Sequence, residues 1–172
     1  MNLDELDAIP ENVERERRFL VTEPSILEGA DWNLIVQAYV FAVDGYAIRV
    51  RRERERIGTT RRMRDLKATL TMKGPRVGDQ RSEFEMEVDP VVAAEVIARS
   101  VNVVEKRRHS LVSQDQTWDV DVFLGPNHGL MIAELEGRHI RGVKAPWWAS
   151  VEVTADSRYN NDSLAFHPFS QW

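Results

Sequence analysis

The stretch Val13-Glu-Arg-Glu-Arg-Arg-Phe-Leu-Val21 decides the fold, because its charges alternate with the period of a β-strand. Successive side chains of a strand point to opposite faces, so one face of this strand carries Glu14, Glu16 and Arg18. Two carboxylates on one face repel each other unless a cation lies between them. The stretch therefore predicts a strand over 13–21 whose charged face binds a divalent metal ion.

The composition indicates one soluble globular domain. The chain has 172 residues, 42% of them hydrophobic, and a net charge of −5, which does not favour nucleic acid or an anionic membrane as a partner. The absence of cysteine excludes disulfides, thiolate metal sites and a cysteine nucleophile. Residues 1–11 are acidic, with no apolar run, and read as a flexible lead-in rather than a secretory signal. We expect a single cytoplasmic domain over 1–172, as a monomer or a homodimer.

Alternating runs separated by turn residues predict about eight strands and one clear helix. Asp44-Gly45 between two apolar runs is a strong hairpin signal, and Asp89-Pro90 starts a helix that reaches about residue 100. Short turns between consecutive strands indicate antiparallel pairing. The predicted strand ranges are 13–21, 34–43, from 46 onward, 68–73, 81–88, 103–112, 117–124, 130–137 and a short final one at 150–154.

The charged face of the first strand recurs on the later strands. Residues that share a face there are Arg49 with Arg51, Arg81 with Glu83 and Glu85, Lys106 with Arg108, Asp119 with Asp121, and Glu134 with Glu136. Such faces look outward in a sandwich, but they line the interior in a closed barrel. The faces are almost purely ionic, and acidic and basic blocks lie largely on different strands. We therefore predict an eight-stranded antiparallel closed β-barrel whose tunnel is charged, with a few peripheral helices.

A tunnel of this kind needs a ligand, because isolated buried charges are costly. The inward groups carry a slight excess of carboxylates, which one or two divalent cations would neutralise. Carboxylate oxygens favour Mg²⁺ or Mn²⁺, and guanidinium groups grip phosphate oxygens. The pattern thus suits a metal-loaded site for a linear polyanion.

The chain resembles the CYTH domains, or triphosphate tunnel metalloenzymes, over nearly its whole length. The first strand resembles the family's signature strand, and the later motifs follow in the family's order. They are Gln37-x-Tyr39, Ile48-Arg-Val-Arg51, Thr71-Met-Lys-Gly74, Arg81-x-Glu83-x-Glu85, Glu105-Lys106-x-Arg108, Asp119-Val-Asp-Val-Phe123, Ala133-Glu-Leu-Glu136 and Glu152-Val-Thr-x-Asp156-x-Arg158-Tyr159. The resemblance implies an antiparallel tunnel that hydrolyses or rearranges triphosphates with Mg²⁺ or Mn²⁺. It is greatest to bacterial members acting on inorganic triphosphate.

The alternating charge pattern and the family resemblance together predict the site residues. The predicted metal ligands are Glu14, Glu16 and Glu136, with Asp121, Glu134 and Glu152 as further candidates; Glu83 and Glu85 either join them or orient neighbouring arginines. The predicted substrate-binding residues are Arg18, Arg49, Arg51, Lys73, Arg81, Lys106 and Arg108. The catalytic candidates are Tyr39 and Lys106, although Tyr39 reads equally well as a packed core residue.

Arg18 departs from the family pattern, which usually has Lys at this position. Arginine keeps the charge but does not readily give up a proton, so a proton-shuttle role is not expected here. A second open question is the charge-rich segment 51–67, which reads as a solvated hairpin or as a basic rim that steers polyanions.

Three functions compete at this point. The first is an inorganic triphosphatase. The second is another enzyme of the same fold, acting on thiamine triphosphate or nucleoside triphosphates or cyclising ATP as a class IV-type adenylate cyclase. The third is a polyphosphate-binding module without catalysis. The full set of acidic residues favours a metal-dependent enzyme acting on a small polyphosphate.

Overall fold

The computed structural model describes residues 13–57, 62–75, 77, 80–137 and 140–172. The expected lead-in at 1–11 and residues 58–61 of the charge-rich segment 51–67 lie outside this part of the chain. The strands run β1 Val13–Val21, β2 Asn33–Val43, β3 Tyr46–Arg56, β4 Met63–Lys73, β5 Gln80–Glu87, β6 Val103–Ser113, β7 Gln116–Phe123, β8 Met131–Glu136 and β9 Ala149–Glu152. The α-helices are α1 Pro90–Arg99 and α2 Asn161–Phe166, and the 3-10 turns are η2 Pro24–Leu27, η3 Gly125–Asn127, η4 Ser157–Tyr159 and η5 Phe169–Gln171.

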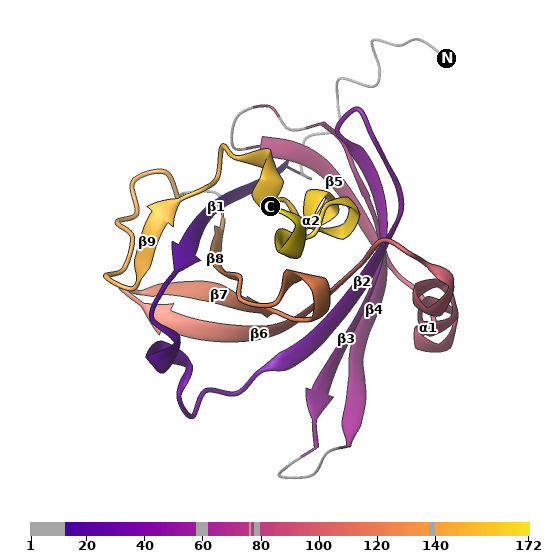
Figure 1. Ribbon diagram of the computed structural model, residues 1–172, viewed down its shortest axis with the longest axis horizontal. Helices are drawn as coiled ribbons and strands as arrows, with labels where there is room; N and C mark the ends of the chain where they lie inside the picture. Colours follow the sequence, from indigo (N-terminus) through magenta and orange to yellow (C-terminus); the bar gives the residue numbers. More distant parts are fainter. Residues whose placement is uncertain (1–12, 58–61, 76, 78–79, 138–139) are drawn as a thin grey trace.

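The strands form one antiparallel sheet, which confirms the mainly-β prediction. Its order is β5-β4-β3-β2-β6-β7-β8-β1-β9, and β5 also pairs with β1 through three residue pairs, Val13 to Ser82 being the first. The described residues hold nine strands, one near each of the predicted ranges, and the short strand predicted at 150–154 is the four-residue β9 beside β1. Figure 1 shows the strands curving around the C-terminal segment that contains α2.

Local turn chemistry sets the register of the hairpins. Asp44 and Gly45 both have positive φ, 51° and 83°, as the two-residue turn between β2 and β3 requires. The turn between β6 and β7 uses Gln114 and Asp115 in the same region, with φ 53° and 57°. Because neither of these two residues is glycine, the local signal for this second hairpin is weaker than that of Asp44-Gly45.

Helix α1 starts as predicted, because the Asp89 side chain accepts hydrogen bonds from the backbone N–H groups of Val91 and Val92. The helix lies outside the sheet (Figure 1) and buries Ala93 against Val50 and Ala68 of β3 and β4. It therefore covers the face of these strands opposite the one that carries Arg49 and Arg51.

Two further cores fix the strands that carry the site. On the outer side of β1 and β7, Phe19, Trp118 and Trp148 pack edge to face, with ring centroids 5.7 Å apart in each pair. At one end of the sheet, Leu164 of α2 is fully buried beside Tyr39. The C-terminal segment is thus part of the hydrophobic core.

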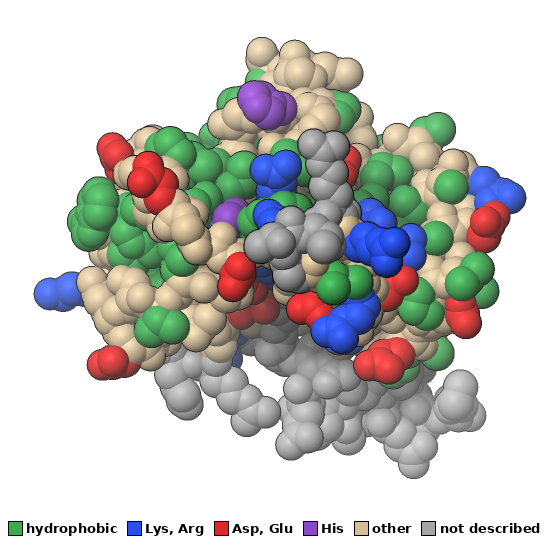
Figure 2. All heavy atoms as spheres, turned by 90° about the horizontal axis from the view of Figure 1, so that it is seen from below, with side chains coloured by type: hydrophobic (Ala, Val, Ile, Leu, Met, Phe, Trp, Pro, Cys, Tyr) green, Lys and Arg blue, Asp and Glu red, His purple; other side chains and the backbone are tan. Residues whose placement is uncertain are grey.

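The charge-rich segment continues two paired strands. Arg52 donates to Asp65 at 2.6 Å and Arg64 pairs with Glu55, so opposite charges neutralise each other along β3 and β4. Figure 2, which shows the molecule from below the view of Figure 1, has Lys and Arg side chains next to Asp and Glu side chains on the surface. These ion pairs favour the solvated hairpin over a basic rim.

Among the described residues, no helix is long and apolar enough to span a bilayer.

Candidate active site

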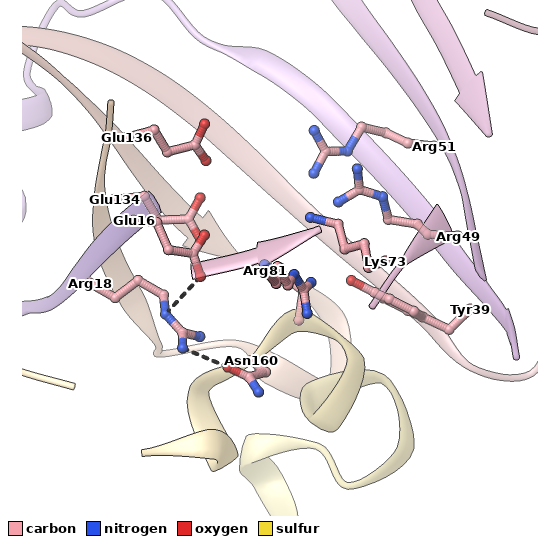
Figure 3. A pocket seen from close by; sticks show the side chains of 11 residues that line it. Glu16, Arg18, Tyr39, Arg49, Arg51, Lys73, Arg81, Glu134, Glu136 and Asn160 are labelled. Atoms are coloured by element: carbon pink, nitrogen blue, oxygen red, sulfur yellow. Dashed lines mark hydrogen bonds and ion pairs between the residues drawn. The ribbon is translucent and has the colours of Figure 1, made fainter. Parts of the chain in front are cut away.

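A pocket inside the curve of the sheet gathers charged side chains from five strands and neutral ones from β2 and the C-terminal segment. All of its lining side chains are polar, and the five cations exceed the three carboxylates by two charges. The lining residues are Glu16, Arg18, Tyr39, Arg49, Arg51, Lys73, Arg81, Glu134, Glu136, Asn160 and Asn161. Figure 3 shows the carboxylates on one side of this pocket and Arg49, Arg51 and Lys73 on the other.

The carboxylate side is built by the pairing of β1 with β8. The register places Glu16 directly opposite Glu136 and Arg18 directly opposite Glu134. Directly opposed residues on one face of an antiparallel pair have Cβ atoms about 4.5–5.5 Å apart, and like charges there are destabilising. Glu14 lies opposite Arg81 in the β1–β5 register. The Glu16–Glu136 pair is thus an arrangement that a cation would stabilise.

The cationic side comes from β3 and β4. Arg49 and Lys73 are 4% and 7% exposed. Burial, together with the nearby cations Arg49 and Arg108, lowers the pKa of Arg51 to about 10, and the Arg51 Nε–H donates to Gln37 Oε1 at 3.0 Å. An anion placed among these groups would relieve their mutual repulsion.

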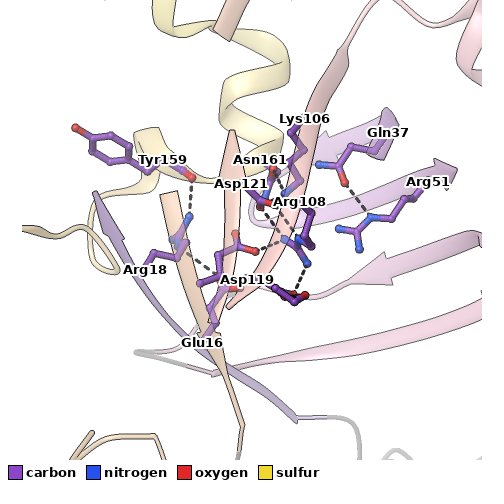
Figure 4. A network of polar contacts seen from close by, with 12 residues as sticks. Glu16, Arg18, Gln37, Arg51, Lys106, Arg108, Asp119, Asp121, Tyr159 and Asn161 are labelled. Carbon is purple, nitrogen blue, oxygen red and sulfur yellow. Dashed lines mark hydrogen bonds and ion pairs between the residues drawn. The ribbon is translucent and has the colours of Figure 1, made fainter. Parts of the chain in front are cut away.

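Beneath the pocket, β6 and β7 form a buried ion-pair network (Figure 4). Lys106 pairs with Asp121, which also accepts two hydrogen bonds of 2.7 Å from Arg108. Arg108 reaches on to Glu134 and, at 3.0 Å, to Asp119. Lys106, Arg108 and Asp121 are therefore bound to one another and lie outside the set that lines the pocket.

Burial and the neighbouring charges together set the pKa values of this network. Burial, helped by the nearby charges of Arg108 and Arg51, lowers the pKa of Lys106 and outweighs the opposing attraction of Asp121 and Glu134. Burial raises the pKa of Glu134, but Lys106 and Arg108 overcome this effect and hold it far below its ordinary value. Glu134 is thus an ionised carboxylate that links the network to the pocket.

Glu83 and Glu85 contact cations of the adjacent strands. Glu83 pairs with Lys73, and Glu85 lies 3.5 Å from Arg49 and 2.7 Å from Lys67. Neither residue lines the pocket. Of the two roles predicted for them, the structure favours the orientation of neighbouring cations.

Glu152 lies on the far side of β1 from the pocket. Its two carboxylate oxygens accept hydrogen bonds from Arg17 Nε and Nη2 at 3.0 and 2.8 Å. The prediction placed Glu152 with the other ligand candidates, whereas the structure brings Glu16, Glu134 and Glu136 together without it. The strand β9 is too short for alternation alone to assign its faces.

Tyr39 is both a core residue and a pocket residue. Its side chain is 3% exposed, and burial raises the pKa of its hydroxyl to about 12. Its hydroxyl oxygen accepts a hydrogen bond from Gln37 Nε2 at 3.4 Å. At neutral pH the group is therefore a protonated donor, able to orient a phosphate oxygen but not to accept a proton from water.

Arg18 is directed toward the C-terminal segment. Its Nη1 donates to the carbonyl of Tyr159 at 2.8 Å and its Nη2 to Asn160 Oδ1 at 2.6 Å, while Nε lies 3.4 Å from Glu16 Oε1. Asn160 and Asn161 were not predicted as site residues. They follow the last strand, where no alternating pattern marks them, so only their packing in three dimensions identifies them.

The donor chemistry of the pocket fits a hard divalent cation. Its carboxylates come from Glu16, Glu134 and Glu136, and no histidine lines it. In the described part of the chain, no three acidic or imidazole side chains already converge as a metal cluster. Mg²⁺ commonly uses one or two protein carboxylates and completes its coordination with water and substrate phosphates. The opposed Glu16 and Glu136 match that mode.

Comparisons with known proteins agree with the motifs. No family model matches the sequence. An inorganic triphosphatase from Acetivibrio thermocellus is 34% identical over 162 residues, which cover 92% of this chain and 97% of the relative. A structure of the inorganic triphosphatase NE1496 matches with a TM-score of 0.60 at 29% identity, covering 88% of this chain and 93% of that one. Together with the ordered motifs, these similarities show that the chain belongs to the CYTH, or triphosphate tunnel metalloenzyme, family.

Proposed function

We propose that this protein hydrolyses inorganic triphosphate with the help of Mg²⁺ or Mn²⁺. The observation that carries the proposal is the division of the pocket into a carboxylate side on β1 and β8 and a cationic side on β3 and β4. A metal-bound phosphate chain lying between the two sides would meet ligands for its cation and for its oxygens. The 34% identity to an inorganic triphosphatase over most of both chains supports the same substrate.

We further propose that the sheet closes into a tunnel. The additional β5–β1 pairing supports a closed tunnel of β1 to β8, with β9 attached outside it. Residues 1–172 then form a single tunnel domain. In such a tunnel the alternating faces bring charges of six or more strands into one water-poor space, where electrostatic contacts are strong.

The proposed metal ligands are Glu16 and Glu136, with Glu134 of β8 beside them; Glu14 of β1, which lies opposite Arg81 in the strand register, is a further candidate. When bound there, the ion would draw charge from phosphate oxygens and lower the pKa of a coordinated water. Asp121 serves this group indirectly, because it fixes Arg108 against Glu134. Glu83, Glu85 and Glu152 lie outside the proposed set.

The remaining residues act on the substrate. Arg49, Arg51, Lys73 and Arg81 would neutralise and align the phosphate chain, and Tyr39 would donate to one of its oxygens. A water oxygen attacks the terminal phosphorus, the bond to the bridging oxygen breaks, and pyrophosphate leaves while orthophosphate forms. Phosphoryl transfer depends mainly on alignment and charge stabilisation, and these cations would supply both to the phosphate chain.

The test is phosphate release from inorganic triphosphate, ATP and thiamine triphosphate, each with Mg²⁺, with Mn²⁺ and with a chelator. We expect inorganic triphosphate to be the preferred substrate and the chelator to abolish release. Arg49→Gln should lower kcat/KM by about 10²-fold, as loss of a charged phosphate contact predicts. Arg52→Gln, on the opposite face of the same strand, is the matched control. Hydrolysis that survives chelation, or tight binding of triphosphate without turnover, contradicts the proposal.

A further inference from the structure

Asn160 and Asn161 are two adjacent neutral side chains in a pocket that is otherwise almost entirely ionised. Both line it, although they come from the C-terminal segment and not from the sheet. Each amide is held by a cation. Asn160 Oδ1 accepts from Arg18 Nη2 at 2.6 Å, and Asn161 Oδ1 accepts from Lys106 Nζ at 3.1 Å (Figures 3 and 4).

These two contacts define which end of each amide meets a ligand. Arginine and lysine side chains are donors only, so each must face the amide oxygen and not the amino group. The N–H donors of Asn160 and Asn161 are then the groups that remain for a ligand. Phosphate oxygens are acceptors, and a neutral donor binds them without adding to the positive excess of the pocket.

Both terminal nitrogens of Arg18 donate to the segment that carries these amides. Its side chain is 2% exposed, and its two terminal nitrogens donate to Tyr159 O, Asn160 Oδ1 and, at 3.3 Å, Thr154 O. The backbone N–H of Arg18 donates to Thr154 Oγ1 at 3.0 Å. The planar guanidinium suits this set of acceptors, whereas one ammonium group would not reach them all.

We propose that Asn160 and Asn161 bind the phosphoryl oxygens of the substrate, and that Arg18 is a positioning residue that holds Asn160 in place for this contact. The inference rests on the proposed function, since it deepens the description of the same pocket. It changes the predicted role of Arg18, which then acts on the substrate through Asn160. It also makes the C-terminal segment a part of the substrate site.

Asparagine-to-aspartate changes separate the two ends of each amide. Asn160→Asp and Asn161→Asp keep an oxygen for Arg18 or Lys106 but remove the N–H donors. We expect KM for inorganic triphosphate to rise at least about 10-fold, as loss of a hydrogen bond to a charged group predicts, with kcat changed much less. The melting temperature should not fall, because each new carboxylate pairs with its cation. An unchanged KM in both variants overturns the proposal.

Two further variants control for the negative charge that Asn160→Asp and Asn161→Asp add to the pocket. Gln171→Glu makes the same change of charge at an exposed position of the same segment and should leave KM unchanged. Asn160→Leu is neutral and of similar size but has neither donor nor acceptor, so KM should rise and the melting temperature should fall. A raised KM in Asn160→Asp with a normal KM in Asn160→Leu would mean charge repulsion alone, and the inference would be wrong.

Arg18→Lys tests the positioning role. KM should rise in Arg18→Lys. The double variant Arg18→Lys/Asn160→Leu should have the same KM as Asn160→Leu alone, because both changes remove the same contact between Arg18 and Asn160. Multiplied effects would mean that Arg18 contacts the substrate itself. Arg158→Lys is the matched control, since Arg158 is an exposed arginine of the same segment that pairs with Asp156 at 2.6 Å.

Activity of the wild-type protein distinguishes a failure of the proposed function from a failure of this inference. If the wild type does not hydrolyse inorganic triphosphate, the proposed function is wrong, and the amide contacts are then tested by calorimetric titration with inorganic triphosphate. Binding at least about 10-fold weaker in Asn160→Asp than in Gln171→Glu supports the inference. Equal dissociation constants overturn it.

Discussion

Glu16 and Glu136 lie directly opposite each other across the β1–β8 pair, and both line the pocket. The fold thus holds two like charges side by side where a neutral or opposite pair would be more stable. Strand pairing enforces this proximity, because the outer faces of β1 and β8 are fixed by Phe19 and Leu135 in the hydrophobic core.

Replacing Glu16 by Gln should remove the response of the protein to divalent ions. Mg²⁺ or Mn²⁺ at 100 times its dissociation constant should stabilise the wild type by about 2.7 kcal/mol, seen as a higher melting temperature. Glu16→Gln should lose most of that shift and lose activity by about 10²-fold, while its metal-free form stays folded because the repulsion from Glu136 is gone. Glu95→Gln on helix α1 is the control. An unaltered metal shift in Glu16→Gln would show that the ion lies elsewhere.

Glu136 and Glu152 should respond differently to the same substitution. Glu136→Gln removes a pocket carboxylate and should reduce kcat/KM by about 10-fold or more, as expected for a metal ligand or its close partner. Glu152→Gln loses an exposed pair with Arg17 and should stay within about twofold of the wild type. Steady-state kinetics at saturating Mg²⁺ checks both. Strong loss of activity in a well-folded Glu152→Gln would restore Glu152 to the ligand set.

Asp121→Asn should be the most destabilising of the conservative changes in the network. It leaves Lys106 buried without its carboxylate, which typically costs about 3–5 kcal/mol of unfolding free energy. Asp65→Asn, which breaks the partly exposed pair with Arg52, should cost about 1 kcal/mol or less. Urea unfolding of the two variants measures the difference. Similar losses would mean that Arg108 alone supports the buried site.

Tyr39 should stay protonated throughout the pH range of the enzyme. Because burial raises its pKa to about 12 from 10.0, the folded protein holds the proton while the unfolded chain releases it. Its contribution to stability is complete below about pH 10 and is lost as the pH rises toward about 12. Urea unfolding of the wild type and Tyr39→Phe across that range should show the loss only in the wild type. Below about pH 10, activity profiles of the two should have the same shape, and a basic limb that disappears in Tyr39→Phe would indicate proton transfer by the hydroxyl.

Alternation was enough to predict most of the fold and the charged face. The prediction of 13–21 agrees with β1, and Asp44-Gly45 forms the predicted turn. These successes share a cause, since period-two patterns and positive-φ turns are local properties. The same pattern brought Glu16, Arg49 and Lys73 to one pocket, because residues of one parity keep one face along a paired strand.

The features that the sequence did not reveal depend on contacts between distant residues. Asn160 and Asn161 lie in the pocket because α2 buries Leu164 beside Tyr39, and no local pattern encodes that packing. The partner of Glu152 is Arg17, at a separation of 135 residues. Likewise, the sharing of Asp121 between Lys106 and Arg108 depends on cross-strand distance, so the pattern gave its face but not its partners.

The contacts of Arg18 also bear on how the molecule folds. Arg18 reaches Tyr159 and Asn160 across 141 and 142 residues of sequence, so the pocket closes through some of the most non-local contacts in the chain. Contacts of such high order form late and slow folding, because the loop entropy must be lost before they become favourable. Catalytic competence should therefore appear in refolding experiments after the sheet has formed, as a separate and final kinetic phase.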